Sequence, residues 1–275
     1  MKQQGIGLGL VLLSTVFLTA CDSSDEKTSK TEAKAPVSIF NTENKADVLP
    51  YLNIKEQPAK IALPFCETKN CINLDIQTID TVDPWMNTWI NKQQASVIQD
   101  QIGLKQNMTL QQAVSAYVKK SDAWQAETKS NDAFELAMYT RIPYQRNQYV
   151  LLQIGVDTQQ EAVKVKERYY FFVADRRAQK MLKMLDVIAK DQQHHMDAMV
   201  QKAYQQWLIA QALEVQKAAP KKLYWGQADW FFDQEGLGLH YRTHEIVEDG
   251  QQLDIYLTKQ QTQQVVKPDF YTFMF

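Results

Sequence analysis

Residues 133–156 read AFELAMYTRIPYQRNQYVLLQIGV, and this stretch decides the fold class. Its two ends, Ala133–Pro143 and Tyr149–Val156, are rich in apolar, β-branched and aromatic residues and have the length of strands. The polar segment between them, Tyr144–Gln148, predicts a hairpin turn. A third strand-prone run follows at Lys164–Ala174. The centre of the chain therefore predicts a meander of three antiparallel strands.

Helices are predicted before and after this meander in the chain. Asp83 and Pro84 have the order expected of an N-cap and a first helical residue. A second helix should run to about residue 127, because Thr109 and Gln112 have the spacing of a capping box. A third is predicted over about Lys190–Lys217, where apolar residues recur with a helical period.

The remaining apolar runs predict further strands. They are Lys60–Phe65 and Ile72–Ile79 before the first helix, and Ala228–Asp233, Gly238–Arg242 and Leu253–Leu257 after the last one. Strands and helices do not alternate regularly along the chain, which argues against a parallel nucleotide-binding sheet. The sequence predicts an α+β fold, with antiparallel sheets and helices packed on one side.

The amino terminus has the features of a lipoprotein signal. Lys2 gives a positive start, the uncharged run Ile6–Leu18 is shorter than the roughly 20 residues that span a bilayer, and the run leads to Leu18-Thr19-Ala20-Cys21. This ending resembles the lipobox of bacterial lipoproteins, which implies a signal peptide over residues 1–20 and a lipid (palmitate) on Cys21. A plain secretory signal or an uncleaved anchor are the alternatives.

The segment after Cys21 is polar. Residues 21–50 are rich in Ser, Thr, Lys, Asp and Glu, and such a composition predicts a flexible tether. We therefore expect a single folded domain over residues 51–275, held by a lipid on the cell membrane or the outer membrane and facing the periplasm. With 30 basic and 32 acidic residues, the chain lacks the positive charge typical of nucleic-acid-binding proteins.

An exported protein meets an oxidising compartment, where paired cysteines form disulfides. Cys66 and Cys71 are separated more widely than the CxxC of redox and zinc sites, and the chain contains three cysteines in all. These two residues therefore predict a structural disulfide across a turn.

Two aromatic stretches offer a candidate binding face. Neighbouring residues of a strand point to opposite faces, so Tyr169–Phe172 and Trp230–Phe232 place aromatic rings on both sides of their strands. The rings are either covered by the protein's own helices and loops or form an exposed platform for a sugar ring or a partner loop. The candidate binding face consists of Trp225, Trp230 and Phe232, with Arg242 as its polar group.

No motif of a known catalytic or phosphate-binding type is present in the sequence. Adjacent His194 and His195 point about 100° apart on a helix, and His240 and His244 are too far apart on a strand to share a metal ion unless the chain bends. We therefore predict no metal, no cofactor and no enzymatic activity, although a site assembled from distant residues would leave no motif.

Read in order, the predicted elements resemble the envelope domain of RsiV-like proteins. The resemblance would cover Tyr51–Phe275 and depends on the strand order and on the hairpin Phe231-Phe232-Asp233-x-x-Gly236-Leu237. The Gly-Ala-His-type segment of the family is missing after Gly155-Val156-Asp157. The resemblance implies a non-catalytic binding or sensing domain for a lysozyme-like protein or a peptidoglycan glycan. A glycan-acting enzyme and a structural or assembly lipoprotein are the alternatives.

Overall fold

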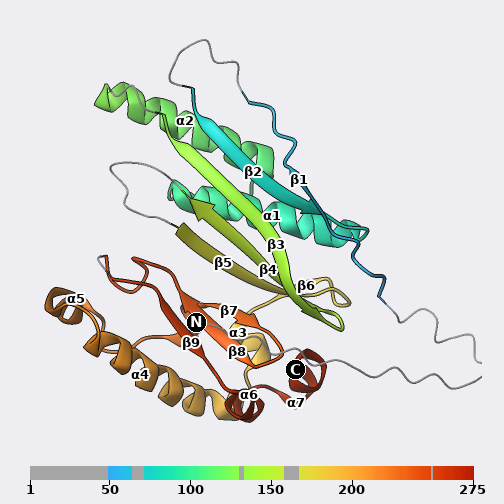
Figure 1. Cartoon of the computed structure of the whole chain (residues 1–275), viewed down its shortest axis with the longest axis vertical. Helices are drawn as coiled ribbons and strands as arrows, with labels where there is room; N and C mark the ends of the chain where they lie inside the picture. The colour runs from blue at the N-terminus through green and yellow to red at the C-terminus, as the bar shows by residue number, and fades with distance from the viewer. Residues whose placement is uncertain (1–48, 64–70, 130–132, 158–166, 249) are drawn as a thin grey trace, which may run out of the picture. The chain divides into compact units, whose positions relative to one another are not determined.

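The predicted meander forms the middle of a six-stranded sheet with the order β1-β2-β3-β4-β5-β6 (Figure 1). In the computed structural model the described residues are 49–63, 71–129, 133–157, 167–248 and 250–275. The strands are β1 (Lys55–Pro58), β2 (Asn73–Asp80), β3 (Glu135–Arg146), β4 (Tyr149–Asp157), β5 (Glu167–Asp175) and β6 (Lys180–Leu182). Both hairpins of the meander, β3–β4 and β4–β5, are antiparallel as predicted.

Several predictions fall outside the described residues. They are the signal peptide with its lipidated Cys21, the tether up to residue 48, and Cys66 of the expected disulfide. Among the residues that are described, no helix is both long enough and apolar enough to cross a membrane.

The first strand lies earlier in the chain than the sequence pattern predicted. Residues 60–63 are not in a strand, and β1 instead covers Lys55–Pro58, where it pairs antiparallel with β2. The prediction was wrong because β1 is a largely exposed edge strand. Such a strand can contain polar residues such as Lys55 and Glu56, so it has no apolar pattern in the sequence.

One strand pair departs from the predicted antiparallel arrangement. β2 and β3 are parallel, with Leu74 opposite Leu136. The chain between them contains two helices, α1 (Pro84–Gln101) and α2 (Leu110–Thr128), and parallel neighbours need such a long crossover connection. The sheet is therefore mixed, within a fold of the predicted α+β class.

Helices α1 and α2 begin as the sequence predicted and cover one face of this sheet (Figure 1). The Asp83 side chain accepts hydrogen bonds from the first turn of α1, and Thr109 and Gln112 form the capping box of α2. Alternate residues of β4, Val150, Leu152 and Ile154, are fully buried in the core beneath the two helices.

The other face of β4 is covered as well. Tyr149 and Leu151 belong to a second core, which is built mainly by a three-stranded antiparallel sheet and the helix α4 (Gln193–Ile209). The strands of this second sheet are β7 (Asp229–Phe232), β8 (Leu237–Tyr241) and β9 (Leu253–Tyr256), at the positions that the sequence predicted. The prediction of helices on one side was therefore incomplete, because a second layer with its own helix packs on the opposite face.

The remaining helices are short. The predicted helix over 190–217 is divided into the 3₁₀ turn Lys190–Gln192, α4 and α5 (Leu213–Ala218), and two other short elements are α3 (Met184–Val187) and the 3₁₀ turn Trp225–Gln227. The chain ends in α6 (Lys259–Val265) and α7 (Pro268–Met274), which the sequence analysis missed. Thr258 and Gln261 form a capping box before α6, and Pro268 occupies the first turn of α7.

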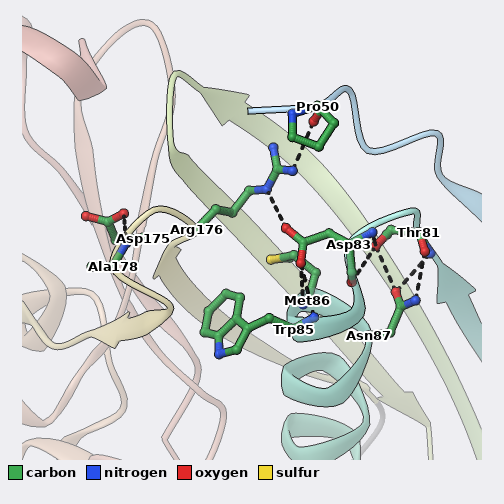
Figure 2. A network of polar contacts seen from close by, with 9 residues as sticks. All are labelled: Pro50, Thr81, Asp83, Trp85, Met86, Asn87, Asp175, Arg176 and Ala178. Carbon is green, nitrogen blue, oxygen red and sulfur yellow. Dashed lines mark hydrogen bonds and ion pairs between the residues drawn. The ribbon is translucent and has the colours of Figure 1, made fainter. Parts of the chain in front are cut away.

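A buried arginine ties the start of α1 to two other parts of the fold (Figure 2). Arg176, in the turn between β5 and β6, is 6% exposed, and its Nε lies 3.2 Å from Oδ2 of Asp83. Its Nη2 donates to the carbonyl of Pro50 at 3.0 Å, while Oδ1 of Asp83 accepts from the backbone N–H groups of Trp85 and Met86. One side chain thus holds the helix cap and the incoming chain together.

We predict that Arg176→Ala lowers the free energy of unfolding by about 3 kcal/mol, because it leaves the Asp83 carboxylate without its buried partner. Urea unfolding followed by tryptophan fluorescence measures the change. Arg146→Ala, at an exposed arginine of the same sheet, serves as control and should stay within about 0.5 kcal/mol of the wild type. Equal effects of the two substitutions would show that the Arg176 contacts do not stabilise the fold.

Candidate functional site

Three of the four residues predicted to form a binding face lie in the protein interior. Trp225 and Trp230 are each 4% exposed and Phe232 is fully buried. Trp230 Nε1 donates to the carbonyl of Leu182 at 3.0 Å, so even its polar atom has a partner inside the protein. Of the two alternatives, the covered one is therefore confirmed, and the candidate binding face built on these rings was wrong, because the second core encloses them.

The fourth residue, Arg242, lies at a cavity. It follows β8 directly, and its Nη1 lies 2.6 Å from Oδ2 of Asp229 on β7. Its Nη2 lies 3.0 Å from Oε1 of Glu245, whose Oε2 accepts from the Arg242 backbone N–H at 2.7 Å. Two carboxylates therefore fix the guanidinium in one orientation.

Asp229 also joins the two sheets. Its Oδ2 accepts the backbone N–H of Phe171 on β5 at 3.1 Å, and the rings of Phe171 and Phe231 pack nearby with centroids 5.0 Å apart. The Phe231 ring can pack against the backbone of β8 because the residue opposite it there is Gly238. A Cβ atom at Gly238 would be 2.1 Å from the Phe231 ring. The site therefore forms where the edge of β5 meets β7.

Tyr170 connects this junction to helix α1. The Arg242 guanidinium lies over its ring, 4.4 Å from the centroid. The Tyr170 hydroxyl donates to Oδ2 of Asp100 at 2.6 Å and accepts from the Gln101 side-chain amide at 2.9 Å. A chain of contacts thus runs from the end of α1 through Tyr170 and Arg242 to the second sheet.

These contacts form one wall of a cavity of about 680 Å³. This volume lies within the range typical of small-molecule sites. The lining residues come from α1, from the segment between α1 and α2, from β5 and from the second sheet: Lys92, Ser96, Val97, Gln99, Asp100, Leu104, Lys105, Gln106, Asn107, Tyr170, Phe172, Asp229 and Arg242.

Burial and neighbouring charges shift the pKa values of the side chains in this wall in opposite directions. Burial raises the pKa of the Asp229 and Glu245 carboxyls, against the stabilising charge of Arg242. Burial disfavours the charge of Arg242, but the two carboxylates outweigh it and raise the pKa of the guanidinium. Burial, together with the Asp100 carboxylate, raises the pKa of Tyr170 to about 12, so the hydroxyl keeps its proton at neutral pH.

The cavity can therefore bind a polar ligand through several kinds of group. The contacts with Asp229 and Glu245 use two of the five N–H donors of Arg242. Gln106 and Asn107 add exposed side-chain amides, and Phe172 adds a half-buried aromatic surface. In the described part of the chain, no three His, Cys, Asp or Glu side chains are grouped to hold a metal ion.

The histidines that the sequence analysis considered do not line the cavity, although His240 lies opposite the lining residue Asp229 on the neighbouring strand. His240 is buried, with Nδ1 2.6 Å from Oδ1 of Asp254 on the neighbouring strand. His244 Nδ1 contacts the carbonyl of Glu248. His194 and His195 stand at the start of α4 with ring centroids 3.9 Å apart.

Most of the cavity carried no signal in the sequence. Lys92, Asp100 and the segment Lys105–Asn107 belong to no motif, because the crossover between β2 and β3 brings them beside β5 only in the folded chain. Tyr170 stood within a predicted aromatic stretch. Arg242 was the one predicted site residue that the cavity contains.

Comparison with known proteins finds solved structures of similar fold. No protein-family model and no curated protein matches the sequence. A crystal structure of a DUF3298 family protein from Pseudomonas aeruginosa PAO1 matches with a TM-score of 0.57 and 14% identity, over 81% of this chain and 97% of that one. A DUF3298 family member from Bacteroides fragilis NCTC 9343 matches with a TM-score of 0.52 and 11% identity, over 80% and 96%. The chain has the fold of these proteins.

At identities this low the likeness shows the fold alone. It agrees with the α+β architecture predicted from the sequence. It carries no information about a ligand or an activity.

We predict that Tyr170→Phe makes the protein less sensitive to alkaline pH. The unfolded chain releases this proton near pH 10, whereas the folded chain holds it to about pH 12, so the free energy of unfolding falls as pH rises between these values. At about 1.4 kcal/mol per pKa unit, the wild type should lose roughly 2–3 kcal/mol more than the variant.

Urea unfolding at pH 7, 10 and 12 measures this difference. At pH 7 the variant should be less stable by about 1 kcal/mol, because it lacks the hydrogen bonds to Asp100 and Gln101. Parallel pH profiles of the two proteins would contradict the buried, neutral state of Tyr170.

Proposed function

We propose that the chain is a non-catalytic, lipid-anchored protein of the bacterial cell envelope whose folded domain binds a glycan derived from peptidoglycan. The lipobox-like ending at Cys21 supports attachment to a membrane with the domain facing the periplasm. The resemblance to RsiV-like envelope domains supports a role in binding or sensing. The cavity beside Arg242 is the proposed binding site.

The observation that carries the proposal is the fixed orientation of Arg242 in the cavity wall. A guanidinium held by Asp229 and Glu245 needs no ordering when a ligand arrives, and preorganised groups bind at lower entropic cost. Around it stand the carboxylate of Asp100 and the exposed amides of Gln106 and Asn107. Carboxylates and amides pair with sugar hydroxyls and N-acetyl groups, since they offer acceptors and donors side by side.

A glycan suits the site better than a lysozyme-like protein, the other ligand that the resemblance implies. A stable protein partner covers roughly 800 Å² on each side and depends on buried aromatic anchors. The aromatic residues expected to serve as such anchors, Trp225, Trp230 and Phe232, are already enclosed in the core. The concave, polar cavity favours a narrow ligand with many hydroxyl groups.

A glycan-cleaving enzyme is the second candidate, and one observation favours it. Asp100 and Asp229 line the same cavity, and burial raises the pKa of Asp229, as is common for a general acid. Against this, the Asp229 Oδ2 already accepts from both Arg242 and the Phe171 backbone. These contacts suit a carboxylate that joins the two sheets.

We predict that the purified full chain binds soluble peptidoglycan fragments and that Asp100→Ala weakens this binding about tenfold, as expected for the loss of a charged hydrogen-bond acceptor. Isothermal titration calorimetry measures the affinity. Asp122→Ala, at an exposed aspartate of α2 outside the cavity lining, is the matched control and should bind like the wild type. A complete lack of binding by the wild type would refute glycan recognition.

We predict that the chain does not cleave these fragments. Incubation with peptidoglycan glycan strands, followed by an assay for new reducing ends, should show no more product than strands incubated without protein. If product accumulates, and Asp229→Asn abolishes it while the variant stays folded by circular dichroism, the protein is an enzyme and the non-catalytic proposal is wrong.

A further inference from the structure

A second cavity adjoins the first one. It has a volume of about 940 Å³ and lies between the end of β1, helix α1 and the start of α2. Lys92 and Asn107 line both cavities. The two cavities are therefore neighbours at these residues, and together they are called the groove.

The groove follows a row of residues along α1. Thr88, Lys92, Ser96 and Asp100 are spaced four residues apart, so consecutive members are neighbours in a row that turns gradually round the helix, and all four are exposed. Thr88 and Lys92 line the second cavity, whereas Lys92, Ser96 and Asp100 line the first. At 1.5 Å per residue, this row is about 18 Å long.

The far wall of the groove is held in place by a side chain. Gln111, in the first turn of α2, accepts from the backbone N–H of Ala62 through Oε1 and donates to the Ala62 carbonyl through Nε2, both at 2.9 Å. This pair of bonds fastens the segment after β1 to the start of α2. The second cavity is therefore a built feature of the fold.

Exposed lysines stand along the whole groove. Lys60 lines the second cavity, Lys105 lines the first and Lys92 lies where the two meet. Within the described residues, no carboxylate forms an ion pair with any of the three.

The carboxylates of the groove, in contrast, are engaged by the protein. Asp80 accepts from the Asn87 amide, Asp100 accepts from the Tyr170 hydroxyl, and Asp229 is paired with Arg242. Of these three carboxylates, Asp229 is the one paired with a cation, because Asn87 and Tyr170 are neutral donors. An anionic ligand can pair with the three exposed lysines.

We propose that the ligand is a linear, anionic oligosaccharide that lies along α1 and occupies both cavities, with Lys92 at their junction contacting a carboxylate of the glycan. This inference rests on the proposed glycan function and specifies the class of glycan. A disaccharide would lie in one cavity and leave the other empty, whereas a longer chain of linked sugars can follow the row from Asp100 to Thr88. Muramic acid residues of peptidoglycan carry a carboxylate on their lactyl group when the peptide has been removed.

The test compares three probes on the purified full chain: a peptide-free disaccharide of peptidoglycan, a peptide-free hexasaccharide strand, and the neutral hexamer of N-acetylglucosamine. The peptide-free hexasaccharide should bind at least about tenfold more tightly than either of the others, the gain expected from charged hydrogen bonds. Its affinity should also fall when salt is raised from 50 to 300 mM, because exposed charges are screened.

Substitution of Lys92, which lines both cavities, tests whether the ligand extends from one cavity into the other. Lys92→Gln should remove most of the gain from chain length, so that the affinity for the hexasaccharide falls toward that for the disaccharide. Lys119→Gln, at an exposed lysine of α2 that lines neither cavity, is the matched control and should keep the gain.

Each other outcome contradicts a defined part of the argument. If disaccharide and hexasaccharide bind equally and Lys92→Gln changes neither, the proposed function stands and the extended groove is wrong. If the neutral hexamer binds as tightly as the carboxylated one, the site binds a long glycan but does not recognise its carboxylates, and the proposed contact with Lys92 is wrong. If none of the probes binds, the glycan function itself fails.

Discussion

The burial of β4 on both faces is the constraint on which the rest of the structure depends. Eight of its nine residues are buried, and alternate side chains belong to two different cores. A strand of this kind cannot be satisfied by one layer of helices, because its second face would expose a continuous apolar strip. Helices α1 and α2 cover one side, and the three-stranded sheet with α4 covers the other.

The cavity beside Arg242 is a consequence of this layering. The second sheet meets the first at β5, where Asp229 accepts a backbone N–H group of Phe171. Burying a carboxylate at this junction requires a cation, and Arg242 provides it. The stacking of Arg242 on Tyr170 then links the junction to the end of α1. Arg242 thus neutralises the carboxylate between the two layers and also shapes the wall of the cavity.

The sequence predicted local features well. The capping residues Asp83 and Thr109 mark the starts of α1 and α2, because a cap is defined by a few neighbouring residues. The meander was found for a similar reason, since the strand pattern and the turn at Asn147 lie within one short stretch. The capping box at Thr258 shows that α6 could also have been predicted from the sequence.

Features that depend on distant contacts were not predictable in this way. The pattern of β2 and β3 is the same for parallel and antiparallel pairing, so the crossover through α1 and α2 was missed. The aromatic pattern around Trp230 fits both an exposed platform and a core strand, and only the packing of the second layer shows that the rings are buried. Asp100 gave no signal, because its partner Tyr170 is 70 positions away.

The contact between Arg176 and the carbonyl of Pro50 gives the groove a direction. It fixes the place where the chain enters the fold, next to the Asp83 cap at the start of α1. Along the helix axis, the cavity beside Thr88 is therefore the nearer one to that place, and the cavity beside Asp100 is the farther one. The groove therefore has two unequal ends, one next to the place where the chain enters the folded domain and one far from it.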